Sequence, residues 1–154
     1  NMFKKGFTLI ELIIVVAIIA LLAAATFVAV NPAKRIGDAN NDQRWADITS
    51  IAEAWEKYEA DTGGSFPAVY TNAIVYAIGT GGFAGGDQCA AVITTANIDL
   101  SNLAGASGYL GGVPSDPLGL DSNGNTNYYF KKDGGIITVG ACLTYDGTSI
   151  VVSR

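Results

Sequence analysis

Few residues of this chain are placed to do chemistry. The 154 residues include no histidine, which removes the usual general base and the commonest metal ligand. The serines lie in loop-like segments without a G-x-S-x-G setting, and no catalytic constellation emerges. The most informative ionisable side chain is Glu11, the one carboxylate in an apolar stretch from Phe7 to Val30. We therefore expect a protein that is not an enzyme, with Glu11 in an unusual role.

The stretch around Glu11 is long enough to cross a membrane. As a helix rising ~1.5 Å per residue it would be roughly 36 Å long, against a hydrocarbon core of ~30 Å. It is apolar on every face, so it does not fit the surface of a small soluble domain. A carboxylate inside such a segment costs roughly 2.5–3.5 kcal/mol on insertion scales, so Glu11 calls for a function and a partner.

The residues before the stretch suggest that partner. Lys4, Lys5 and Gly6 precede Phe7, and the sequence KKG-FTLIE resembles the processing site of the type IV pilin family, which includes the pseudopilins of type II secretion. In that family a prepilin peptidase cuts after the glycine and methylates the new N-terminal residue. The resemblance implies cleavage after Gly6, N-methylation of Phe7, and subunit assembly through Glu11 and the Phe7 amine of a neighbouring subunit.

The same resemblance implies a division of the chain and a set of partners. Residues 1–6 would be the prepilin leader, 7–30 the transmembrane and filament-core helix, and 31–154 the globular pilin head. The partners would be the prepilin peptidase, an inner-membrane assembly platform and other pilin subunits in a homopolymer. The precursor would be a single-pass membrane protein, and the mature subunit would belong to an extracellular or periplasmic filament on the cell surface.

Two other interpretations of the N-terminus stay open at this point. In a secretory signal peptide, Lys4 and Lys5 would be the basic region and Ala23–Ala25 the small-residue cleavage site. A plain transmembrane anchor is the second alternative. Both leave Glu11 without a partner. Basic residues flank the stretch on both sides, so positive-inside counting does not set its orientation.

Charge and composition limit the functions of the remaining domain. The formal net charge is −5, and charged residues make up only 15% of the chain. This acidic balance argues against broad nucleic-acid binding through a basic face. Few charges suit a domain that packs among neighbours or faces the outside of a cell. Cofactors are not expected, apart from the calcium considered below.

The two cysteines, Cys89 and Cys142, fit an exported domain. In an oxidising compartment they are expected to form a disulfide. The loop between them is long, and the chain-entropy argument assigns such a bridge about 4 kcal/mol. The pair resembles the C-terminal disulfide that ties a variable loop to the sheet in many pilins.

The chain after the apolar stretch predicts an α+β head. Asn31-Pro32 should break or loosen the helix, and Ala33–Thr62 reads as a second, amphipathic helix that ends at Gly63-Gly64. One face of this helix is apolar and should pack on a sheet, with Trp55 in the core. The apolar positions are Ile48, Ile51, Ala52, Trp55 and Tyr58.

The strands are clearest at the C-terminal end. NYYFKK, GIITVGACLTY and TSIVVS, separated by Asp133-Gly134 and Asp146-Gly147, predict a three-stranded antiparallel meander. Upstream the pattern is weak: Ala73–Ile78 and Ala90–Thr94 could be short strands, or one strand and one helix. The glycine-rich GTGGFAGGD is expected to form a flexible surface loop, and Ile98–Leu110 could hold a short helix. The predicted fold is pilin-like, a long N-terminal helix packed on a C-terminal antiparallel β-sheet.

One segment of the head could bind a metal ion. Asp121, Asn123 and Asn125 supply oxygen ligands at alternate positions, as calcium loops do, although the glycine and glutamate of an EF-hand are absent. Upstream, Asp116-Pro-Leu-Gly119 resembles the D-P-W-G segment of major pseudopilins, in which calcium orders this loop; here leucine replaces tryptophan. The alternative is an Asn-Gly turn whose polar side chains hold their own backbone.

Overall fold

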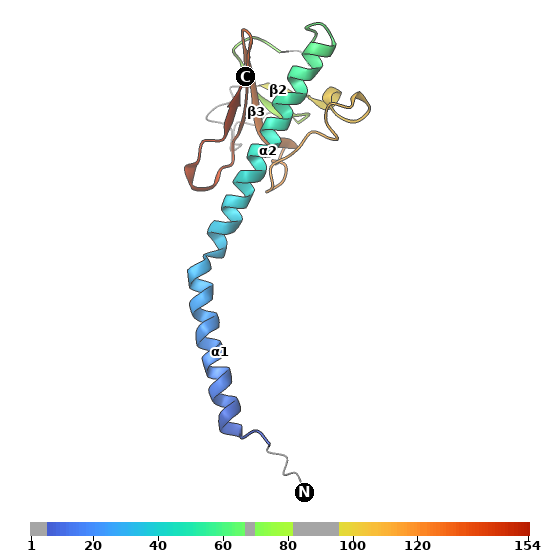
Figure 1. Cartoon of the computed structure of the whole chain (residues 1–154). Coiled ribbons are helices and arrows are strands. Elements are labelled where there is room, and N and C mark those ends of the chain that lie inside the picture. The colour runs from blue at the N-terminus through green and yellow to red at the C-terminus, as the bar shows by residue number, and fades with distance from the viewer. Residues whose placement is uncertain (1–5, 67–69, 82–95) are drawn as a thin grey trace. The chain divides into compact units, whose positions relative to one another are not determined.

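The computed structural model describes residues 6–66, 70–81 and 96–154 and divides the chain into two compact units. The first unit ends at Gly37 and the second begins at Asp38. Figure 1 shows the chain, with helices α1 and α2 and strands β2 and β3 labelled.

The first unit is built on helix α1, Leu9–Val30, in which no residue is buried. The helix ends at Val30, and its C-cap residue Asn31 has a left-handed backbone with φ 44°. Asparagine tolerates this conformation better than most residues. Helix α2, Pro32–Asp61, begins at the next residue, with proline in the first helical position, where its missing N–H is not needed. The predicted break at Asn31-Pro32 is therefore confirmed as a helix boundary.

The rest of α2 belongs to the second unit and carries the predicted apolar face. Ile48, Ile51 and Trp55 are fully buried. The helix ends at Asp61, and Gly63 follows with φ 67°. The Gly64 N–H donates to the Glu59 carbonyl oxygen at 2.8 Å. This left-handed glycine cap is the predicted end of the helix.

The sheet has five strands in the order β2-β1-β3-β4-β5. Strands β3, Asn125–Asp133, β4, Ile136–Ala141, and β5, Val151–Ser153, form the predicted antiparallel meander. Strand β1, Val75–Gly79, pairs with β3 in the antiparallel sense, with a register shift between Ala77 and Gly79. It confirms the strand predicted at Ala73–Ile78.

The α+β fold class is confirmed, and the sheet contains more than the predicted antiparallel strands. It is mixed, because β2, Ala96–Ile98, pairs with β1 in parallel. Residues 80–95 separate these strands, which meets the dozen or more residues that a parallel connection requires. The short helix expected within Ile98–Leu110 is present as two single 3₁₀ turns, Ser101–Leu103 and Gly105–Ser107, divided by extended backbone at Ala104. The strand predicted at Ala90–Thr94 and most of the glycine-rich loop lie outside the described residues.

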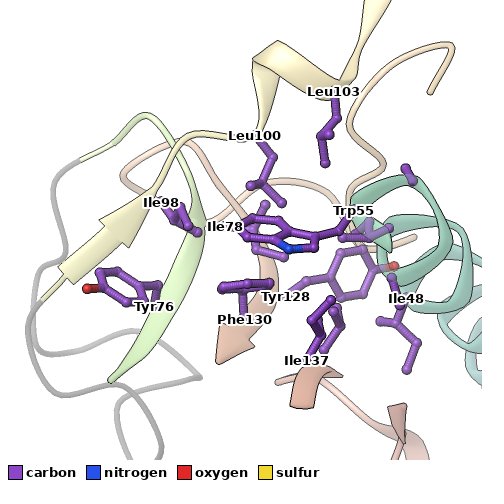
Figure 2. Packing of buried hydrophobic residues seen from close by; sticks show 14 of the residues in the cluster. Ile48, Trp55, Tyr76, Ile78, Ile98, Leu100, Leu103, Tyr128, Phe130 and Ile137 are labelled. Atoms are coloured by element: carbon purple, nitrogen blue, oxygen red, sulfur yellow. The ribbon is translucent and has the colours of Figure 1, made fainter. Parts of the chain in front are cut away.

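The core of the head lies between α2 and the sheet (Figure 2). The Trp55 indole lies against Phe130 of β3, with ring centroids 4.2 Å apart. Ile98 and Leu103 enter the same core from β2 and the first 3₁₀ turn. The prediction that the sheet covers the Trp55 face is confirmed.

Buried polar contacts also join α2 to the rest of the head. Arg44 lies in a bidentate ion pair with Asp116, with Nε to Oδ2 at 2.6 Å and Nη2 to Oδ1 at 2.9 Å. The Tyr128 hydroxyl donates to Asp47 Oδ2 at 2.7 Å. Burial, helped by this carboxylate, raises the pKa of Tyr128 well above its usual range. The contacts fix α2 against the segment before β3 and against β3 itself.

Candidate assembly site at the N-terminus

The site is built where helix α1 begins. Thr8 is the N-cap residue, with an extended backbone, and Leu9 is the first helical residue. Glu11 lies at the third helical position. A threonine followed three residues later by a glutamate forms a capping box, in which each side chain bonds the backbone N–H of the other residue. The local sequence T-L-I-E therefore starts the helix and positions the carboxylate.

Both Thr8 donors converge on one oxygen of Glu11. The Thr8 backbone N–H donates to Oε2 at 2.8 Å, and the Thr8 hydroxyl donates to the same oxygen at 2.7 Å. In return the Glu11 N–H donates to Thr8 Oγ1 at 3.3 Å. In the described part of the chain Oε1 accepts no hydrogen bond. The carboxylate is thus held by one oxygen at the positive end of the helix dipole, and the other oxygen can accept a donor from outside.

The predicted processing residues lie next to this carboxylate. Phe7 precedes the N-cap and is 91% exposed. Gly6 is exposed as well, and a Cβ built on it would meet nothing within 4 Å. Gly6, Phe7 and Glu11 therefore lie together at one accessible helix start. Lys4 and Lys5 lie outside the described residues.

Thr8 was not among the residues predicted for this site. The signal was present, since S/T-x-x-E before an apolar run marks a capping box. From the sequence, Glu11 was interpreted only as a partner for another subunit. The structure adds that Thr8 already satisfies half of the carboxylate within the same chain.

The body of α1 presents apolar side chains in every direction. Its large hydrophobic residues are between 48% and 80% exposed along the helix, with Val15 and Val28 at the two extremes. By length and composition, a helix starting at Leu9 can cross a membrane, and the apolar part of it has no buried residues. Such a surface needs lipid or other helices around it.

The candidate calcium segment is held by its own hydrogen bonds. Asp121 Oδ1 accepts from the backbone N–H groups of Asn123 and Asn125, both at 2.8 Å, and Oδ2 accepts from Asn125 Nδ2 at 3.0 Å. Asn125 Oδ1 is buried without a hydrogen bond, but it lies toward Gly79, where an added Cβ would be 2.5 Å away. In the described residues, no group of three or more acidic, His or Cys side chains could hold a metal ion. Calcium binding at Asp121, Asn123 and Asn125 stays a prediction.

The predicted disulfide is only half described. Cys142 packs with Val75 and Tyr129 around Ala77 on the sheet, and the described residues contain no free cysteine. Cys89 lies outside the described residues. The Cys89–Cys142 pairing therefore stays a prediction.

The comparisons with known proteins agree with this N-terminal site. Residues 1–27 match the family model described as the prokaryotic N-terminal methylation motif. This motif is the prepilin signature of type IV pilins and pseudopilins, a family that is structural rather than catalytic. The match favours this interpretation of the N-terminus over a secretory signal peptide. No curated protein and no solved structure matches the chain significantly.

Proposed function

We propose that this chain is the precursor of a structural subunit of a type IV pilus-like filament. Helix α1 inserts in the membrane, a prepilin peptidase cuts after Gly6 and methylates Phe7, and the mature subunit joins a homopolymer at an inner-membrane assembly platform. The observation that carries the proposal is Glu11. It is the only carboxylate of an apolar helix, and Thr8 holds one of its oxygens while the other is open to a partner.

The apolar surface of α1 supports polymerisation. A helix exposed on all sides can be solvated by lipid before assembly and by equivalent helices afterwards. Leaving the bilayer then exchanges lipid contacts for helix contacts without exposing apolar area to water. The filament would be extracellular or periplasmic, with the head outside the central bundle.

The open oxygen of Glu11 supports a defined register between subunits. In a bundle of apolar helices an unpaired carboxylate is costly. The protonated amine of Phe7 on a neighbouring subunit would be the charge partner of Glu11. It would donate to Oε1, the oxygen that Thr8 does not contact. Because a charge pair of this kind is made at one axial offset only, it would select one packing among many similar apolar ones.

A pseudopilin of a type II secretion or DNA-uptake machine is the second candidate. The segment Asp116–Gly119 favours it by its resemblance to major pseudopilins. In this chain Asp116 shapes that turn, since its Oδ1 accepts from the Leu118 N–H and its carbonyl oxygen accepts from the Gly119 N–H. The alternative from another class of protein is a membrane-anchored extracellular binding domain that never polymerises. The state of the N-terminus in the mature protein distinguishes this anchor from a filament subunit.

The test replaces Glu11 with Ala in the native host. We expect membrane insertion and cleavage after Gly6 to continue. We expect filament yield to fall at least about tenfold, because losing one partner of a buried charge pair costs roughly 2–5 kcal/mol. N-terminal sequencing and intact mass measure processing, and sheared filaments measure assembly.

The matched control is Glu53→Ala, which removes an exposed carboxylate from α2. It should process and assemble normally. Normal filament yield from Glu11→Ala would contradict the register role. A wild-type chain that keeps Lys4-Lys5-Gly6 in mature protein would instead support the permanent anchor and overturn the filament proposal.

A further inference from the structure

The neck segment, residues 31–36, carries two basic side chains directly after the apolar helix. Asn31 organises it, since its Oδ1 accepts from the Lys34 N–H at 3.4 Å and its carbonyl oxygen accepts from the Arg35 N–H at 3.3 Å. Lys34 and Arg35 are thus held in the first turn of α2, and both are exposed. The neck lies in the same compact unit as α1.

Chain length places the neck at the depth of lipid headgroups. Lys34 and Arg35 follow Val30 by four and five residues, which is about 6–8 Å along a helix. The headgroup layer on each side of the hydrocarbon core is of similar thickness, about 5–8 Å. Ile36 is 63% exposed beside the basic pair. Basic side chains next to an exposed apolar one are typical of a segment at the membrane interface.

The remaining charge of the chain is distributed unevenly. Thirteen of the 14 acidic residues follow Gly37, whereas four of the nine basic residues precede Asp38. Residues 38–154 are therefore strongly acidic, whereas the side chains of residues 1–37 carry a net positive charge, and Lys34 and Arg35 are the basic residues among them that follow the apolar helix.

We infer that Lys34 and Arg35 bind the anionic headgroups of phospholipids in the leaflet on the side of the head. The phosphate oxygens accept from the ammonium and the guanidinium, and the guanidinium can donate to two oxygens at once. This inference rests on the membrane stage of the proposed function. It adds that anionic lipid retains the subunit in the bilayer, because a subunit that leaves must break these contacts.

The expected gain in affinity for anionic lipid can be taken from the usual contribution of basic residues near anionic membranes. Each such side chain contributes about fivefold in affinity for an anionic surface, so the pair should contribute roughly 25-fold. The contact is electrostatic and lies in the headgroup layer, so salt should weaken it.

The experiment measures which lipids stay bound to the full chain. The protein is reconstituted in nanodiscs of equimolar phosphatidylcholine and phosphatidylglycerol, and native mass spectrometry counts each lipid retained on the monomer. All variants carry Lys4→Gln and Lys5→Gln, so that the leader cations do not contribute. The test variant adds Lys34→Gln and Arg35→Gln. The matched control adds Lys131→Gln and Arg154→Gln, which removes two positive charges from the head.

The parent is the chain that carries only Lys4→Gln and Lys5→Gln. We expect the parent and the control to retain phosphatidylglycerol in preference to phosphatidylcholine, and we expect the test variant to lose this preference. Equal preference in the parent and the test variant would overturn the inference, as would an equal loss in the control. A preference that appears only in dimers or larger species would assign the pair to a second copy of the chain and would also overturn it.

Carbonate extraction of the same samples separates this inference from the proposed function. A chain that resists extraction but shows no lipid preference overturns the lipid contact alone. A chain that is extracted overturns the membrane stage of the proposed function together with the inference.

Discussion

Arg44 is a buried charged residue that joins helix α2 to the rest of the head. Its side chain is 2% exposed and that of Asp116 is fully buried. Besides the bidentate pair, Arg44 Nη1 donates to Asn41 Oδ1 at 2.9 Å, and Asn41 in turn bonds the backbone of Tyr145. Arg44 thus joins α2 to Asp116, and the Asn41 side chain that it contacts joins α2 to Tyr145. Removing it leaves a buried carboxylate without its counter-charge.

We predict that Arg44→Ala lowers the free energy of unfolding by roughly 3–5 kcal/mol, the usual cost of breaking a buried ion pair from one side. Urea unfolding of the full chain in detergent, followed by tryptophan fluorescence, measures it through the buried Trp55. The control is Arg154→Ala, since Arg154 pairs with Glu53 and Glu56 at the surface, where a pair contributes about 0–1 kcal/mol. Equal effects of the two substitutions would contradict a stabilising role for the buried pair.

At the scale of elements, helix boundaries follow from local sequence. Thr8 and Glu11 start α1, Asn31 and Pro32 separate the two helices, and Gly63 ends α2. Each boundary depends on residues within a few positions of one another, through a cap, a missing N–H or a left-handed backbone. The helix boundaries can therefore be predicted from the local sequence without knowledge of tertiary contacts.

We predict that Gly63→Ala destabilises the head by about 1–2 kcal/mol, the cost of a left-handed backbone for a residue with a Cβ. A Cβ at Gly63 would meet nothing within 4 Å, so the cost is conformational and not steric. Thermal unfolding of the full chain in detergent measures the change. Gly135→Ala is the control, because Gly135 is equally open but is not left-handed. A Gly63→Ala variant as stable as the control would show that the cap does not stabilise α2.

At the scale of the whole molecule, the predicted pairing of Cys89 with Cys142 would close a long loop of the head. We predict that reduction lowers the free energy of unfolding by roughly 2–5 kcal/mol, because an open chain gains more freedom on unfolding than a closed loop. Urea unfolding with and without reductant measures it. The double variant Cys89→Ser/Cys142→Ser should be insensitive to reductant. Two titratable thiols in the oxidised, exported protein would contradict the pairing.

The candidate site could largely be predicted from the sequence, because its residues lie within six positions of one another. The roles of Gly6, Phe7 and Glu11 were inferred from the resemblance of KKG-FTLIE to the prepilin processing site. The capping box formed by Thr8 follows from the S/T-x-x-E pattern but was not predicted. The free Oε1 of Glu11 could not be predicted, because it depends on both Thr8 groups donating to the same oxygen, Oε2. Side-chain geometry, and not residue type, sets which oxygen accepts.

By itself the sequence determined the two helices, their boundaries, the β3–β5 meander and the assembly of α2 on a sheet. These depend on periodicity, caps and turns that act over a few residues. Only the tertiary structure decided that Arg44 pairs with Asp116, that β2 runs parallel to β1, and that Asp121 bonds its own turn. The first two bring together segments far apart in the chain, and the third depends on where a carboxylate points, so neither local propensity nor residue spacing specifies them.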